Sequence, residues 1–221
     1  MKRLLREDRD GRTTLLTQNL APGRRAYNED LVARGGSEYR TWDPFRSKLA
    51  AAIIKGLPED VVSEGQGILY LGASTGTTAS HVSDIVGPSG LVVAVEFSPR
   101  VARELVERVA RPRTNVIPFV CDARDPAKYS ITKADVVYCD IAQPDQTEIA
   151  IANCRAILKA GGTLLLVVKA RSIDVLKAPS KVFAEEAKKL EGAGFEVKQV
   201  VELSPFDKDH ALVYATDGGE A

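Results

Sequence analysis

The stretch from Gly67 to His81, GILYLGASTGTTASH, constrains the fold of this 221-residue chain more than any other segment. It begins with a short apolar run, Ile68 to Leu71, that favours a strand, breaks at Gly72 into a turn of small residues, and can enter a helix from about Thr77. A buried parallel strand, a glycine-rich turn and a helix form the first unit of a nucleotide-binding α/β fold. Gly72 and Gly76 would let the backbone pass close to a ligand at the helix N-terminus. The spacing Gly-x-x-x-Gly is not that of dinucleotide enzymes, so by itself it also fits an ordinary helix cap.

The rest of the chain alternates strand-like and helical segments. We expect further strands at 91–95, 116–120, 134–139, 163–168, 195–203 and 211–215, and helices at 77–86, 101–110, 146–159 and 179–192. This alternation predicts an α/β fold with a mostly parallel sheet covered on both faces. No helix fits in segment 204–210, so the last two strands must be antiparallel. One antiparallel strand on a seven-stranded, otherwise parallel sheet is the architecture of the Rossmann-type class I methyltransferases.

The first 44 residues form a different unit. Segments 13–17 and 38–42 are β-prone, and turn residues separate them, so we expect a small N-terminal β domain over residues 1–44. The α/β domain would then span 45–221 and begin with a helix capped by Ser47. Residues 1–48 hold 11 Lys and Arg against 7 Asp and Glu, a net charge of +4, and the remainder holds 19 against 23, a net of −4. This bias would suit a polyanion near the N-terminal part, although a solvated surface is its commoner cause.

Composition excludes several other classes of function. The three cysteines, Cys121, Cys139 and Cys154, are widely spaced and form no CxxC pair, so neither a disulfide framework nor a zinc site is indicated. We see no signal peptide, and no apolar run approaches the roughly 18 residues of a membrane span. Free thiols and no membrane partner are therefore expected.

Charged residues follow the expected strands at their carboxyl ends, where ligands of open α/β sheets bind. These ends carry Gly72, Glu96, Asp122, Asp140 and Lys169. Glu96 could accept hydrogen bonds from two ribose hydroxyls, Phe97 could lie against a purine, and Asp122 could accept from an exocyclic amine. Taken alone, each carboxylate is more often a solvated loop charge than a ligand-binding group. Three carboxylates at successive strand ends favour an adenosine ligand. The missing third glycine and Walker lysine favour S-adenosylmethionine over NAD or ATP.

Several motifs closely resemble the fibrillarin family in its archaeal form. They are YLGASTGTT from Tyr70, DIAQPDQ from Asp140, VVKARSID from Val167, Phe206-x-x-x-His210 and Trp42-x-Pro44-x-x-Ser47-Lys48-Leu49-Ala50-Ala51-Ala52-Ile53. The resemblance covers nearly the whole chain. The eukaryotic form begins with a Gly/Arg-rich tail that this chain lacks, which indicates the archaeal type.

The resemblance implies an RNA 2′-O-ribose methyltransferase. Members transfer methyl from S-adenosylmethionine to guide-RNA-selected nucleotides of ribosomal RNA, and in archaea also of transfer RNA. They act as the catalytic subunit of the box C/D ribonucleoprotein, with a Nop-family scaffold protein and a kink-turn-binding ribosomal-type protein. A cytoplasmic location is implied for an archaeal member, whereas the eukaryotic counterpart would be nucleolar.

Site residues follow from the same motifs. Carried over by motif, the cofactor site is Gly72, Ala73, Thr77, Thr78, Glu96, Phe97, Asp122, Ala123, Asp140, Ile141, Ala142 and Gln143. The implied catalytic set is Lys48, Asp140, Lys169 and His210, with His210 where related 2′-O-methyltransferases carry a glutamate. The sulfonium already activates the methyl group, so no metal is expected, and the product would be S-adenosyl-L-homocysteine.

The residue types suit this chemistry. To act as a base, Lys169 would have to lose its proton near neutral pH, which Lys48 as a like charge would favour and Asp140 would oppose. We therefore interpret Lys169 as the donor that orients the 2′-oxygen, and it could also be the base. His81 and Trp42 are interpreted as structural rather than functional.

Two alternatives remain open at this stage. The first is a non-catalytic RNA-binding scaffold that kept the fold, against which the intact catalytic set argues. The second is a small-molecule methyltransferase or a nicotinamide oxidoreductase.

Overall fold

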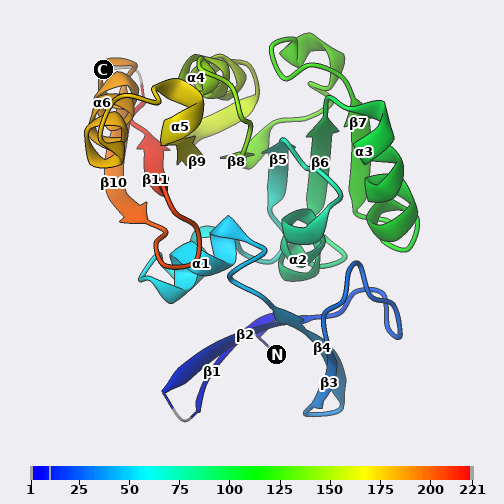
Figure 1. Ribbon diagram of the computed structural model, residues 1–221. Coiled ribbons are helices and arrows are strands. Elements are labelled where there is room, and N and C mark those ends of the chain that lie inside the picture. The colour runs from blue at the N-terminus through cyan, green and yellow to red at the C-terminus, as the bar shows by residue number, and fades with distance from the viewer. Residues whose placement is uncertain (1, 10, 220–221) are drawn as a thin grey trace.

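The computed structural model describes residues 2–9 and 11–219, which form two β-sheets (Figure 1). The smaller, antiparallel sheet has the strand order β1-β2-β4-β3. Its strands are β1 (Leu4–Arg9), β2 (Arg12–Gln18), β3 (Leu31–Arg34) and β4 (Ser37–Trp42). The predicted β segments 13–17 and 38–42 lie in β2 and β4. Strands β1 and β3 were not predicted individually, because LLREDR and LVAR show no clear two-residue alternation.

The larger sheet has seven strands in the order β10-β11-β9-β8-β5-β6-β7. They are β5 (Gly67–Leu71), β6 (Leu91–Glu96), β7 (Val116–Val120), β8 (Ala134–Cys139), β9 (Leu158–Lys169), β10 (Phe195–Glu202) and β11 (His210–Asp217). Strand β11 is antiparallel to both of its neighbours, and the other pairs are parallel. The predicted Rossmann-type architecture with a last antiparallel pair is confirmed.

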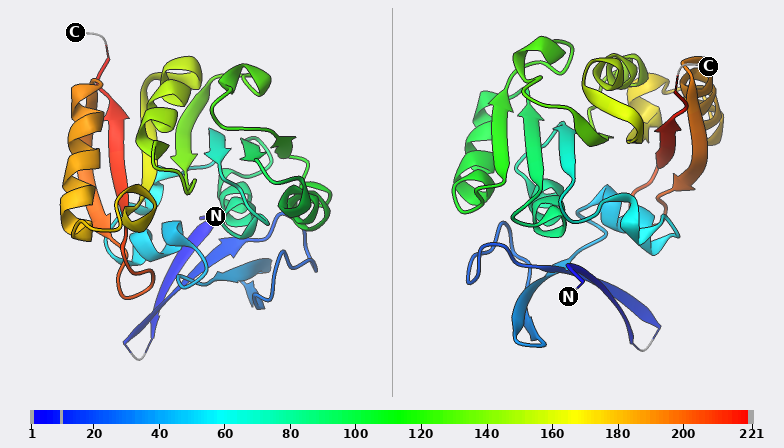
Figure 2. Two further views of the ribbon diagram at one scale, coloured as in Figure 1. Left: turned by 45° about the horizontal axis from the view of Figure 1, so that its top comes forward. Right: turned by 180° about the vertical axis from the view of Figure 1, so that it is seen from behind.

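Helices cover both faces of this sheet, as the views in Figure 2 show. They are α1 (Lys48–Ile54), α2 (Thr77–Val86), α3 (Pro99–Leu105), α4 (Gln146–Ile157), α5 (Ala170–Ile173) and α6 (Pro179–Gly192). Alternate residues of β5 enter different cores: Ile68 and Tyr70 pack with α1, α2 and α3, whereas Leu69 and Leu71 pack with α4 and α6. Within the described residues, no helix is long and apolar enough to cross a membrane.

Two element boundaries differ from those predicted. The expected helix 101–110 begins at Pro99, because Ser98 caps it by accepting from the Val101 N–H, and it ends in a π-helical turn, Val106–Ala110. Strand β9 begins at Leu158 rather than at residue 163, and α4 ends at Ile157. The pairing of β8 with β9 skips several residues of β9, where Gly161 has a φ of +70°. Because this bulge interrupts the two-residue alternation of the strand, the sequence pattern did not indicate that β9 begins at Leu158.

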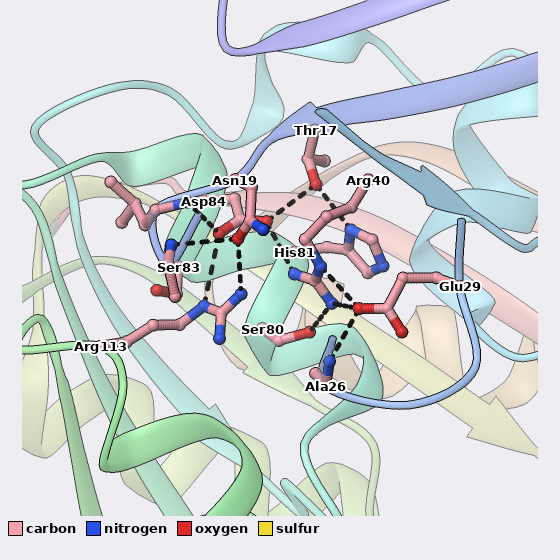
Figure 3. Close-up of polar contacts among 12 residues, drawn as sticks. Thr17, Asn19, Ala26, Glu29, Arg40, Ser80, His81, Ser83, Asp84 and Arg113 are labelled. Atoms are coloured by element: carbon pink, nitrogen blue, oxygen red, sulfur yellow. Dashed lines mark hydrogen bonds and ion pairs between the residues drawn. The ribbon is translucent and has the colours of Figure 1, made fainter. Parts of the chain in front are cut away.

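A buried polar cluster joins the small sheet to α2 (Figure 3). Arg40 of β4 donates to Glu29 at 2.7 Å, to Asp84 at 2.7 Å and to Ser80 at 2.8 Å. Arg113 lies 3.3 Å from the other oxygen of Asp84. The charged side chains of the cluster are fully buried and sum to zero, two guanidinium groups against two carboxylates. The small sheet is therefore locked to the large domain by ion pairs rather than by apolar packing alone.

His81 lies beside this cluster on α2. Its Nδ1 is 2.7 Å from the Thr17 hydroxyl, its Nε2 is 2.6 Å from the Tyr27 hydroxyl, and its ring stacks on Trp42 with centroids 5.0 Å apart. Burial, and after it the charges of Arg40 and Arg113, hold the pKa of His81 well below its usual 6.5. His81 and Trp42 thus belong to the packing between the sheets, which agrees with their interpretation as structural residues.

We predict that Asp84→Asn lowers the free energy of unfolding by about 3–5 kcal/mol, because it leaves two buried guanidinium groups facing one carboxylate. Urea denaturation followed by circular dichroism measures this change. The matched control is Glu185→Gln, which breaks an exposed pair with Lys177 and should lower the free energy of unfolding far less. Equal, small losses in both variants would show that the cluster does not hold the two parts together.

A second prediction concerns how the free energy of unfolding depends on pH below neutrality. The folded protein keeps His81 neutral, whereas the unfolded chain protonates it below about pH 6.5. The unfolded state then binds more protons, so the free energy of unfolding should fall as the pH drops from about 6.5, by up to about 1.4 kcal/mol per pH unit from this group. Denaturation of His81→Gln at the same pH values should give a flatter profile. An unchanged slope in that variant would contradict the assignment.

Candidate active site

A cavity of about 320 Å³ lies at the carboxyl ends of β5 to β9. Of the twelve residues that the motifs assigned to the cofactor, nine line it: Gly72, Glu96, Phe97, Asp122, Ala123, Asp140, Ile141, Ala142 and Gln143. Lys169 lines it as well. The remaining three, Ala73, Thr77 and Thr78, do not. Thr78 is buried and donates to the Ser47 hydroxyl at 2.9 Å, so its side chain ties α2 to the start of α1.

The glycine-rich turn fits tightly against the end of β8. Gly72 has a φ of +78°, and a Cβ there would lie 2.7 Å from the carbonyl oxygen of Asp140. Gly76, with a φ of +92°, has another reason to be glycine, because a Cβ would meet the side chains of Val109 and Leu105. The missing side chain of Gly76 therefore makes room for the packing of α2 against the end of the α3 segment. Gly76 is not among the residues that line the cavity, and the expectation that it lets a ligand approach stays a prediction.

Glu96 lines the cavity, and backbone N–H groups hold its carboxylate in place. One carboxylate oxygen accepts from the Ser74 N–H at 2.8 Å and the other from the Ser98 N–H at 2.9 Å. Each oxygen keeps a further lone pair, so both can accept from a ligand hydroxyl. Phe97, next in the chain, is 71% exposed and presents an aromatic ring at the same place. This pair can receive a ribose and its base.

Arg124 bridges two loops beside the cavity and was not predicted from the sequence. Its guanidinium binds both oxygens of Asp145, at 2.8 and 3.1 Å, and lies 3.3 Å from the Gln143 side chain. The hydrogen bond to Asp145 raises the pKa of Arg124, and its backbone N–H donates to Asp122 at 2.9 Å. The bridge therefore fixes the loops that follow β7 and β8. No sequence signal indicates a pair that joins residues in two separate loops.

Opposite charges alternate along one edge of the site. Lys169 Nζ lies 2.8 Å from one oxygen of Asp140 and 2.9 Å from its carbonyl oxygen, while Lys48 Nζ lies 3.3 Å from the other carboxylate oxygen. Lys48 is also 3.7 Å from Asp207, whose carboxylate is 2.5 Å from His210 Nδ1. The structure thus brings together Lys48, Asp140 and Lys169. His210 is the strand partner of Lys169 in the β9–β11 pair, and its ring is joined to Lys48 through Asp207, which lies between the two.

This edge can orient and activate a hydroxyl group. Two ammonium groups share one carboxylate, and all three side chains are mostly buried, so their interactions are less screened than on an open surface. An oxygen placed against Lys169 would receive a charge-assisted hydrogen bond. No group of three or more His, Cys, Asp or Glu in the described part of the chain could hold a metal ion.

Comparisons with known proteins agree with this geometry. A family model described as Fibrillarin matches residues 4–218. The fibrillarin-like rRNA/tRNA 2′-O-methyltransferase of Sulfolobus acidocaldarius is 53% identical over 206 residues, which cover 92% of this chain and 89% of that protein. The crystal structure of Aeropyrum pernix fibrillarin with natively bound S-adenosyl-L-methionine matches with a TM-score of 0.86 and 49% identity, over 96% of this chain and 97% of that one. The fibrillarin/Nop5p complex matches with a TM-score of 0.85 and 40% identity, over 97% of each chain.

We predict that Gly72→Ala perturbs both stability and the cavity. Its positive φ should cost about 1–2 kcal/mol, and the clash with the Asp140 carbonyl should add to this. Gly161→Ala is the matched control, since Gly161 has a similar φ of +70° but nothing within 4 Å of the added Cβ. Chemical denaturation compares the two, and calorimetry compares their affinity for S-adenosylmethionine. Equal stabilities and equal affinities would contradict the close approach at Gly72.

Proposed function

The chain belongs to the fibrillarin family, and from this premise we propose that it methylates ribose 2′-hydroxyls of ribosomal and transfer RNA. The methyl donor is S-adenosylmethionine, and the nucleotide is selected by a guide RNA within a box C/D ribonucleoprotein. One observation carries the proposal: Lys169 and Lys48 share the Asp140 carboxylate at the edge of a cavity suited to a nucleoside. A hydroxyl is a weak nucleophile, and this arrangement supplies what its methylation needs, namely orientation and removal of a proton.

The groups that line the cavity fit S-adenosylmethionine. Glu96 offers two oriented acceptors for vicinal hydroxyls, and the exposed ring of Phe97 offers a surface for the adenine. Gly72 and the Asp140 carbonyl leave no room for a side chain at the turn, so the backbone itself forms this wall. When bound, the cofactor supplies a methyl group already activated by its sulfonium. We assign the residues that line the cavity to this cofactor.

The residues at the edge act on the RNA hydroxyl. Asp140 holds Lys169 through both its carboxylate and its carbonyl oxygen, so the ammonium is fixed at the end of β9. Lys169 donates a hydrogen bond to the ribose 2′-oxygen and so orients it. Formation of the carbon–oxygen bond would be matched by loss of the hydroxyl proton, and we assign the uptake of this proton to Lys169 Nζ when its amine is neutral. The Asp140 carboxylate would stabilise the positive charge that develops on the oxygen and on Lys169.

The partners follow from the family and from the charge of the chain. The similar fibrillarin/Nop5p complex supports a Nop-family scaffold as partner. We also propose a kink-turn-binding protein and the box C/D guide RNA as further components. The formal net charge of zero supports recruitment of RNA through the scaffold rather than by this chain alone, since phosphate binding depends on excess positive charge.

The test is methyl transfer by the reconstituted complex. The chain, a Nop-family scaffold, a kink-turn-binding protein and a guide RNA are combined with labelled S-adenosylmethionine and a target RNA. We expect one 2′-O-methyl group at the guided nucleotide, and none without the scaffold. Cofactor binding without any transfer would instead indicate a non-catalytic scaffold. A thermal shift with NAD but not with S-adenosylmethionine would indicate an oxidoreductase.

We predict that Lys169→Ala slows single-turnover methyl transfer by about 10²–10⁴-fold, the usual contribution of a positioned proton-transfer group. Cofactor affinity and complex assembly should change little. Lys169→Arg should restore little activity, because a guanidinium cannot give up its proton and donates with a different geometry. A preassembled complex gives the rate without binding or product release. Near wild-type rates in Lys169→Ala would place the active centre elsewhere.

A further inference from the structure

Asp207 lies between two residues of the proposed catalytic set, and neither the sequence pattern nor the motifs assigned it a role. It sits in the connection between β10 and β11, just before His210 at the start of β11. Its Oδ1 is 2.5 Å from His210 Nδ1 and its Oδ2 is 3.7 Å from Lys48 Nζ. One carboxylate therefore faces both the imidazole and the ammonium, and its side chain is only 32% exposed.

The direction of the hydrogen bond to His210 follows from chemistry. An ionised carboxylate can only accept, so Nδ1 of His210 must donate. In its neutral form the ring then carries its proton on Nδ1 and keeps the lone pair on Nε2. A carboxylate holds a catalytic histidine in a defined tautomer and orientation in the same way in hydrolase triads. Asp207 thus determines which nitrogen of His210 is free.

The charge count at the site gives Asp207 a second task. Among the described residues, Lys48 and Lys169 would without it pair with the Asp140 carboxylate alone. With it, Lys48 lies between two carboxylates. Basic and acidic side chains then follow each other in turn along the series Lys169, Asp140, Lys48, Asp207 and His210. Asp207 attracts Lys48 from the side opposite Asp140, and the ammonium is thereby held between the two carboxylates.

We propose that Asp207 is a positioning residue for methyl transfer, which fixes the His210 ring through Nδ1 and holds Lys48 beside Asp140. This inference rests on the proposed function, since it concerns the same site. Asp207 acts through its two neighbours. It also links the β10–β11 connection to α1, so that His210 and Lys48, which lie far apart in sequence, keep a constant separation.

The first test measures the tautomer of the His210 imidazole directly and does not depend on activity. The chain has only two histidines, so long-range ¹H–¹⁵N spectra of the full-length protein resolve both rings. At alkaline pH, where an imidazole carries a single proton, we expect the Nδ1–H tautomer for His210 in the wild type. Asp207→Ala removes the acceptor and should shift His210 toward the Nε2–H tautomer. His81, which is bound by Thr17 and Tyr27, serves as an internal reference that should not change.

The second test is the single-turnover rate in the reconstituted complex. Asp207→Ala should lower the rate by about 10- to 100-fold, the effect of a small misplacement of reacting groups. Its affinity for S-adenosylmethionine, measured by calorimetry, should remain within about twofold, since Asp207 does not line the cavity. Asp209→Asn is the matched control: it removes the same charge from the same connection, but Asp209 pairs with Arg171 at 3.1 Å. Its rate should stay within about twofold of the wild type.

An unchanged His210 tautomer in Asp207→Ala would overturn the inference, as would equal rate losses in the Asp207 and Asp209 variants. If the wild-type complex transfers no methyl group, the proposed function fails and the catalytic part of this inference fails with it. The His210 spectrum still reports separately whether Asp207 fixes the ring, so the two failures are distinguishable.

Discussion

The buried ion pair between Arg40 and Asp84 is the contact on which the geometry of the site depends. It joins β4 of the small sheet to α2, and α1 begins only a few residues after β4 ends. Ser47, the N-cap of α1, accepts from the hydroxyl of Thr78 on α2, so that both ends of this short connection are fixed. Lys48 is the first residue of α1. Its ammonium is therefore positioned by the small sheet and α2, whereas Asp140 and Lys169 are positioned by the large sheet.

Much of the large domain could be predicted from sequence because its determinants are local. Apolar segments of strand length alternate with helical ones, and the rule that ligands bind at the carboxyl ends of parallel strands indicated Glu96, Asp122, Asp140 and Lys169 before any contact was known. The structure places all of these at one cavity. Lys48 is different, because nothing in the pattern of α1 separates it from a solvated helix lysine. Only the family motif indicated it.

The features that the sequence did not predict depend on contacts between distant segments. Asp207 meets Lys48 across most of the length of the chain, and Arg124 meets Asp145 in a separate loop. Gly76 was expected to let a ligand approach, because a glycine in a turn before a helix often does so. Its packing against Val109 is a second reason for glycine, and this contact cannot be known without the fold. The bulge in β9 was not predicted for the same reason, because it is a property of the β8–β9 pairing.

Asp140 connects the two halves of the proposed reaction in a single residue. Its N–H donates to the Leu71 carbonyl at 2.9 Å, and its own carbonyl lies against Gly72, so its backbone is part of the wall that the glycine-rich turn forms. Its carbonyl also accepts from Lys169, and its carboxylate faces both lysines. A shift of the turn would therefore move the lysines as well. In the proposed reaction, the methyl donor and the hydroxyl acceptor would thus be aligned through one residue at the end of a central strand, which favours a fixed approach geometry over one that must form after binding.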